Sequence, residues 1–269
     1  MSQKISIGTQ QKELRLNLWN CWKQGSLTSV MAKLYIVPTP VGNLEDMTFR
    51  AVRVLKEADL ILAEDTRTSS VLLKHFEIEN KMMSHHKFNE HKTASMIKER
   101  ILSGLNVALI SDAGTPGISD PGAILAGLAR KAGHKVIPIP GASAFASLAS
   151  VAGAGGKTLI FEGFLSPKPG RRRSRLRELM ATGDAVILYE SPFRIVKLLT
   201  DIADIDNGRR VVIGRELTKL HEEITEGTAK EVLEDYSSRT KVQGEFAVFI
   251  SGNKNTKLSD ESSDNINEA

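Results

Sequence analysis

The sequence predicts an α/β protein of two domains, with a mostly parallel sheet in the first domain and a mixed sheet in the second. From about residue 34 onward, short apolar runs typical of strands alternate with segments of helical period. Such alternation is typical of a parallel sheet that is covered by helices on both faces. The chain has 269 residues, 41% of them hydrophobic and 25% charged, which suffices for one large or two modest cores.

Four apolar runs in the first half are the predicted strands of the first domain: 34–37, 60–63, 107–110 and 136–139. Loops that are rich in proline, glycine or acidic residues follow them. Between the first two runs, residues 48–58 have the period of a helix. Phe49, Val52 and Leu55 are expected on one face of this helix.

The glycine-rich segment 152–156 predicts the boundary between two domains, 32–152 and 157–252. Five apolar runs after it predict the second sheet: 159–161, 185–189, 210–213, 222–225 and 246–250. The last two follow short connections or end the folded part, which favours a mixed sheet. We expect residues 1–31 to be a flexible extension and the polar residues 253–269 to be a disordered tail.

Composition excludes several classes of protein. The single cysteine, Cys21, rules out a disulfide framework and a cysteine zinc site, and no metal-ligand spacing is clear elsewhere. No apolar run reaches the roughly 20 residues that span a bilayer. The first 30 residues lack the apolar core of a secretory signal, so we expect a cytoplasmic protein. A net charge of +4 is a mild bias toward polyanionic partners.

The loop 111–122, SDAGTPGISDPG, is the most informative of the strand-end loops. In open α/β sheets, ligands bind beyond the carboxyl ends of the strands. Glycine permits close approach of a ligand to the backbone, and proline limits the entropy lost on binding. We therefore predict a ligand site here. The alternative is a wide turn whose Asp120 caps the following helix, and a cap at Asp120 is expected in either case.

Seven motifs occur in an order that resembles a known family: LYIVPTPVGNLEDMT, ILAEDTR, ALISDAGTPGISDPG, IPGASA, FEGFL, LYESPFR and RELTKLHEEITEG. They resemble the ribosomal RNA small subunit methyltransferase I family, within the tetrapyrrole methylase fold group, over about residues 34–252. The resemblance implies two α/β domains with S-adenosylmethionine bound between them. It also implies methylation of the ribose 2′-hydroxyl of cytidine 1402 in 16S rRNA, and a homodimer.

Comparison with the wider tetrapyrrole methylases implies a donor pocket in three loops. Its expected residues are Ser111, Asp112, Ala113, Gly114, Pro116, Ser143, Ala144 and Glu190. The first loop of that group is rich in glycine. Here Pro38 and Pro40 replace glycines, so we do not assign a donor contact to this loop.

Transfer of a methyl group to a hydroxyl gains from a base that accepts the proton. Our candidates are Glu64 and Asp65 at a strand end, and His86, with His85 and His91 as its neighbours. The alternative for Asp65 is a structural role, as the cap of a helix and the partner of Arg67. The alternative for the histidines is a solvated or RNA-facing surface.

An arginine-rich segment follows residue 170: Arg171, Arg172, Arg173, Arg175 and Arg177. So many cations at a predicted helix start are unfavourable, and we expect them to lack carboxylate partners. Contact with the phosphates of RNA would relieve their repulsion. We predict an RNA-binding segment at Arg171, Arg172, Arg173 and Arg175, extended by Arg194. The alternative is a solvated start of a helix.

Two other functions remain open. A methyltransferase that acts on a tetrapyrrole precursor would keep the fold, although the arginines and the form of the loop 111–122 argue against it. A non-catalytic RNA-binding module would show no saturable binding of S-adenosylmethionine.

Overall fold

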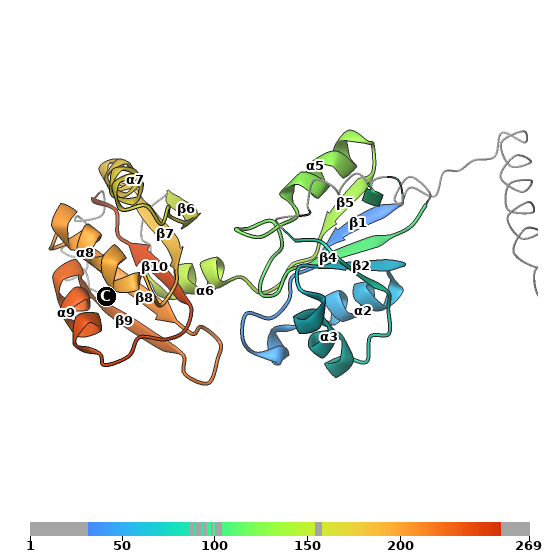
Figure 1. The fold of residues 1–269 in the computed structure, drawn as a ribbon, viewed down its shortest axis with the longest axis horizontal. Helices are drawn as coiled ribbons and strands as arrows, with labels where there is room; N and C mark the ends of the chain where they lie inside the picture. Colours follow the sequence, from blue (N-terminus) through green and yellow to red (C-terminus); the bar gives the residue numbers. More distant parts are fainter. Residues whose placement is uncertain are drawn as a thin grey trace, which may run out of the picture.

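The computed structural model describes residues 32–86, 89, 93, 96–97, 99, 104–153 and 158–253. Figure 1 shows two α/β domains side by side, joined by the segment between β5 and α6. The predicted extension 1–31 and the predicted tail 253–269, apart from Asn253, lie outside the described residues. None of the helices in the described ranges is long and apolar enough to cross a membrane.

The first domain contains a five-stranded sheet in the order β3-β2-β4-β1-β5. All its described pairings are parallel, which confirms the predicted sheet type. The strands are β1 (Lys33–Ile36), β2 (Leu60–Ala63), β3 (Met82–Ser84), β4 (Val107–Ile110) and β5 (Lys135–Pro138). The prediction missed β3, because three residues are too few to show a period.

Helices cover both faces of this sheet. On one face lie α2 (Phe49–Glu57) and α3 (Thr66–His75), after the short 3-10 helix η1 (Leu44–Asp46). On the other face lies α5 (Ala123–Lys131). The central strands β2 and β4 are buried along their whole length, as expected of parallel strands between two helical layers.

The helix α2 is present, and two of the three residues predicted for its apolar face, Val52 and Leu55, pack against the core, whereas Phe49 does not. Ala51, Val54 and Leu55 are buried, whereas Phe49 is 97% exposed. The Thr48 hydroxyl accepts a hydrogen bond from the Ala51 backbone N–H at 3.1 Å and starts the helix. This start places Phe49 in the first turn, off the stripe that faces the sheet.

The second domain contains a mixed sheet in the order β6-β7-β10-β8-β9, as predicted. β6 and β7 are parallel, and the other neighbours are antiparallel. The strands are β6 (Leu159–Phe164), β7 (Ala185–Glu190), β8 (Arg210–Arg215), β9 (Glu223–Thr228) and β10 (Phe246–Ile250). One face is covered by three helices: α7 (Pro169–Ala181), α8 (Ile195–Ile205) and α9 (Ala229–Ser238).

The opposite face is covered by α6 (Ala144–Val151), which corrects the predicted domain boundary. Leu148 and Ala152 are fully buried against Ile187 and Phe249 of the second sheet. The chain therefore crosses between domains before α6, within residues 139–143, and not at 152–156. The glycines of that segment follow a helix that already belongs to the second domain.

Candidate functional site

Three loops of the first domain meet at the carboxyl ends of its strands. Thr39 and Gly114 exchange both backbone hydrogen bonds at 2.9 Å, which joins the loop after β1 to the loop after β4. The Thr115 hydroxyl donates to the Ala142 carbonyl at 2.9 Å, which adds the loop after β5. These contacts hold the three loops as one surface, which faces the second domain.

Two glycines allow the domains to come close. A Cβ at Gly42 would collide with the Lys219 side chain, on the β8–β9 connection. A Cβ at Gly163, in β6, would lie 2.5 Å from the Ser119 hydroxyl oxygen. Gly163 also has a φ of 72°, which side chains disfavour. Both positions therefore require glycine where loops of one domain touch the other.

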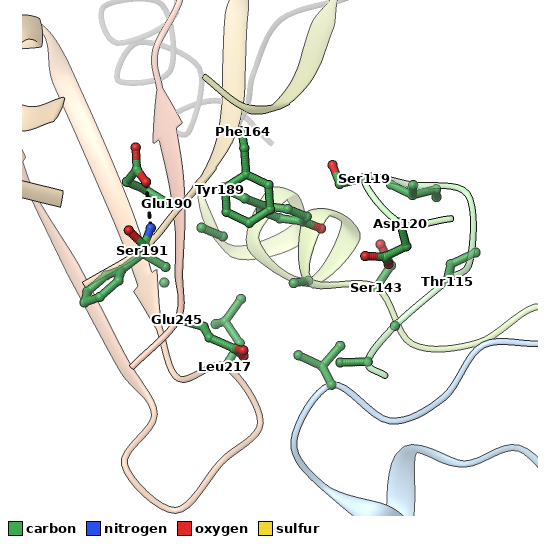
Figure 2. Close-up of a pocket in the computed structure, with 18 of the residues that line it drawn as sticks. Thr115, Ser119, Asp120, Ser143, Phe164, Tyr189, Glu190, Ser191, Leu217 and Glu245 are labelled. Atoms are coloured by element: carbon green, nitrogen blue, oxygen red, sulfur yellow. Dashed lines mark hydrogen bonds between the residues drawn. The ribbon is translucent and has the colours of Figure 1, made fainter. Parts of the chain in front are cut away.

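A cavity of about 390 Å³ lies between the two domains (Figure 2). Loop residues of the first domain that line it are Val41, Ala113, Gly114, Thr115, Ile118, Ser119, Asp120 and Ser143. The second domain contributes Ala144, Phe164, Tyr189, Glu190, Ser191, Pro192, Gly214, Leu217, Glu245, Phe246 and Ala247. Its size and its mainly small and apolar lining suit a small-molecule ligand. In the part of the chain that the structure describes, no cluster of His, Cys, Asp and Glu could hold a metal ion.

The predicted donor residues separate into two groups. The cavity is lined by Ala113, Gly114, Ser143, Ala144 and Glu190. The other three, Ser111, Asp112 and Pro116, are not among the described residues that line it. The buried Ser111 hydroxyl donates to the Gly114 carbonyl at 3.3 Å, and Asp112 accepts from the Asp65 backbone N–H at 3.1 Å. Both residues support the shape of the loop.

Glu190 is 2% exposed and has one carboxylate oxygen left to bind a ligand. Its Oε1 accepts from the Ser191 backbone N–H at 2.7 Å and pairs with Arg194 at 2.7 Å. Its Oε2 has no hydrogen-bond partner among the described residues. A buried acceptor without a donor is costly, and a donor group of a ligand would satisfy it.

Asp120 lines the cavity, and the predicted cap of α5 at this residue is wrong. The N-cap residue of α5 is Gly122, with a φ of 129° and no side-chain cap. Burial, together with the negative charges of Glu64 and Asp112, raises the pKa of Asp120 to about 7. The sequence shows the motif but not this environment, because Glu64 and Asp112 follow different strands.

None of the predicted bases Glu64, Asp65 and His86 is among the described residues that line the cavity. Asp65 caps α3 by accepting from the Arg67 backbone N–H at 2.8 Å, and it pairs with the Arg67 guanidinium at 2.6 Å. Hydrogen bonds from Arg67 lower the pKa of Asp65 to about 2. The alternative interpretation of Asp65 is thus confirmed.

Glu64 has a different environment from Asp65. Burial and the charge of Asp112 raise the pKa of Glu64, and His86 opposes this shift. The neighbouring His85 is fully buried, and its Nδ1 lies 2.7 Å from the Thr93 hydroxyl, so it does not form a solvated surface. His91 lies outside the described residues.

The expectation that the arginines of α7 lack carboxylate partners is wrong. Arg172 and Arg173 each pair with Asp201 at 2.6 Å, and the side chain of Arg172 is only 4% exposed. Arg175 pairs with Glu162 at 2.8 Å and with Glu178 at 3.1 Å. Arg172 therefore cannot reach RNA from the surface. Within the described chain, Arg171 and Arg177 are exposed and form no ion pair.

The predicted RNA contact at Arg194 is also engaged within the protein. Its guanidinium pairs with Glu190 at 2.7 Å, and its side chain is 24% exposed. Arg194 thus helps to hold Glu190 in the cavity wall.

Two α/β domains with a ligand cavity at the carboxyl ends of a parallel sheet define a class of enzymes that bind their ligand between domains. The family model of the Tetrapyrrole (Corrin/Porphyrin) Methylases matches residues 33–233. The chain belongs to this family. Within it, the chain groups with proteins named "Ribosomal RNA small subunit methyltransferase I".

The relative from Borrelia garinii is 45% identical over 219 residues, which are 81% of this chain and 98% of the relative. The relative from Bacillus subtilis is 40% identical over 233 residues, which are 87% of this chain and 80% of the relative.

Solved structures confirm the fold. Uroporphyrin III C-methyl transferase from Thermus thermophilus superposes with a TM-score of 0.58 at 16% identity, over 82% of this chain and 97% of that one. The methyltransferase CobJ superposes with a TM-score of 0.61 at 18% identity, over 82% of this chain and 94% of that one. At these identities the similarity concerns the fold alone.

Proposed function

We infer that this protein is a methyltransferase that modifies the ribosomal RNA of the small ribosomal subunit. The observation that carries this conclusion is the match to the Borrelia garinii relative, at 45% identity over 98% of its length. Such a match includes both domains and the loops between them. The proteins with tetrapyrrole substrates in their names are only 16–19% identical, so the alternative of a tetrapyrrole precursor is less well supported.

We propose S-adenosylmethionine as the methyl donor. The cavity fits a molecule of this kind, because it combines apolar walls with an unsatisfied acceptor at Glu190. The donor has amino and hydroxyl groups that can supply the missing hydrogen bond. Ala113, Gly114, Ser143, Ala144 and Glu190 are the residues that would hold it. When bound, the donor supplies an electrophilic methyl group without a metal ion.

The proposed acceptor is the ribose 2′-hydroxyl of cytidine 1402 in 16S rRNA, which the family resemblance implies. The chain must exclude water from the cavity and orient this hydroxyl, since alignment alone can supply several kcal/mol. The glycine contacts at Gly42 and Gly163 support this role, because they bring the domains together around the cavity.

We further propose a homodimer in the cytoplasm, where ribosomal subunits are found. The exposed Arg171 and Arg177 remain candidates for RNA contact, together with the exposed parts of Arg173 and Arg175.

Transfer of a labelled methyl group tests the proposal. Small ribosomal subunits that lack the modification are incubated with the protein and labelled S-adenosylmethionine, and the modified nucleotide is mapped. We expect one 2′-O-methyl group at cytidine 1402. Labelling of uroporphyrinogen III in place of the subunit would support the alternative, and saturable RNA binding without any transfer would support a non-catalytic module.

A further inference from the structure

Methylation of a ribose hydroxyl requires a group that accepts the hydroxyl proton. We propose that Asp120 is the catalytic carboxylate that contacts this hydroxyl and takes its proton. This inference rests on the proposed function. It replaces Glu64, Asp65 and His86, which were the candidates from the sequence.

Asp120 lies in the wall of the cavity, on a loop that is held in place. Figure 2 shows its carboxylate directed away from its own loop, toward the side of the cavity where Tyr189 lies. The backbone around it is constrained, because Ser119 has a φ of 69° and Pro121 follows. The Ser119 hydroxyl oxygen occupies the space that a Cβ at Gly163 would need. The second domain thus fixes the loop that carries Asp120.

The Asp120 carboxylate has no cation beside it in the described part of the chain. Among the described residues, no arginine or lysine pairs with Asp120, and no donor forms a hydrogen bond with it. The ionisable groups that face it are the carboxyls of Glu64 after β2 and Asp112 after β4, and the phenol of Tyr189 in β7. Glu190 and Glu245 line the same cavity. A carboxylate in such surroundings favours uptake of a proton.

The proton affinity agrees with this role. Burial first, and then the charges of Glu64 and Asp112, raise the pKa of Asp120 to about 7. A general base works best when its pKa lies near the pH of the reaction. Asp65 is a much weaker base, because Arg67 lowers its pKa to about 2.

The proposed step balances in atoms and charge. The ribose 2′-oxygen forms a bond to the methyl carbon while the bond from that carbon to the donor sulfur breaks, and the bonding pair stays on sulfur. The hydroxyl proton passes to an Asp120 carboxylate oxygen. The products are a 2′-O-methyl ribose, a neutral thioether and a protonated Asp120, which then loses its proton to water.

Single-turnover methylation of small subunits by the Asp120→Asn variant is the main test. We expect the rate constant to fall by about 10²- to 10⁴-fold, which is the range for the loss of a general base. S-adenosylmethionine affinity, measured by calorimetry, should stay nearly unchanged. The matched control is Asp204→Asn, an exposed aspartate of α8 outside the cavity, which should keep the wild-type rate.

The pH dependence provides a second test. The wild-type rate constant should rise with pH and level off above about 7, and this inflection should disappear in Asp120→Asn. The ¹³C NMR titration of the Asp120 carboxyl in the donor-free protein should give a pKa of about 7. This measurement needs no activity.

The outcomes separate the two proposals. If the wild-type protein methylates small subunits and Asp120→Asn does so at full rate, the role of Asp120 is overturned while the proposed function stands. A large loss of donor affinity in Asp120→Asn, or a titration near the ordinary value of 3.8, would also overturn it. If the wild-type protein does not methylate subunits, the proposed function fails, and the titration still tests the environment of Asp120.

Discussion

Two aspartates, one in each domain, lie in opposite electrostatic surroundings. Asp201 of α8 has a side chain that is 1% exposed, and two guanidinium groups neutralise it at 2.6 Å. Asp120 lies in the wall of the cavity, with carboxyl groups as its charged neighbours and no cation among the described residues. The neutralised charge of Asp201 holds α8 and α7 together. A carboxylate among other carboxyl groups, such as Asp120, destabilises the fold and is typical of sites that bind or transform a ligand.

The same substitution at both aspartates should change stability in opposite directions. We expect Asp201→Asn to lower the free energy of unfolding by about 3–5 kcal/mol, because it leaves the buried Arg172 without a countercharge. Asp120→Asn should instead raise it at pH 8 by about 1–2 kcal/mol, once the partial exposure of the carboxyl is allowed for. Urea denaturation of both variants measures the difference.

The pH dependence of the Asp120→Asn effect has a definite sign. Folding raises the pKa of this acid from 3.8 to about 7, so the wild-type protein loses stability as the pH rises through this window. The gain of the variant should be full above pH 7 and should vanish below about pH 4. A gain that is constant with pH would mean that charge is not its cause.

Gly163→Ala should disturb the loop that carries Asp120. At φ 72° the new methyl group costs about 1–2 kcal/mol of stability, and it meets the Ser119 hydroxyl. Gly133→Ala is a matched control, since Gly133 has a φ of 82° and no atom within 4 Å of the added Cβ. Both variants should unfold more easily, but only Gly163→Ala should slow methyl transfer. If both variants transfer methyl groups at the same rate, the contact between Gly163 and Ser119 does not contribute to the reaction.

The smallest effect is expected at the two arginines of α7 that have no ion pair. Replacing Arg171 and Arg177 by alanine should flatten the plot of log RNA affinity against log salt by about 0.7–0.9 per lost phosphate contact. Stability and donor affinity should stay the same, because both side chains are exposed. Filter binding of RNA at several salt concentrations measures the slope. An unchanged slope would show that these arginines belong to an ordinary solvated surface.

The sequence alone sufficed for nine of the ten described strands and for the type of each sheet. Strands such as β2 and β4 are apolar along their whole length, and a local pattern of this kind is readable without a structure. The motif 111–122 was also recognisable, because it is long and unusual in composition. The family resemblance implied Ala113 and Gly114 as donor residues, and both line the cavity.

Tertiary structure decided the role of each charge. Asp201 lies 29 residues from Arg172, and Glu162 lies 13 residues from Arg175, so the arginines looked unpaired in the sequence. The sequence favoured a helix cap at Asp120. It could not show that Glu64 and Asp112, which follow other strands, lie near this carboxyl group. Likewise, α6 belongs to the second domain and not to the first, because Leu148 packs on the second sheet. Burial and countercharge depend on which segments meet in space, and local patterns determine only which elements form.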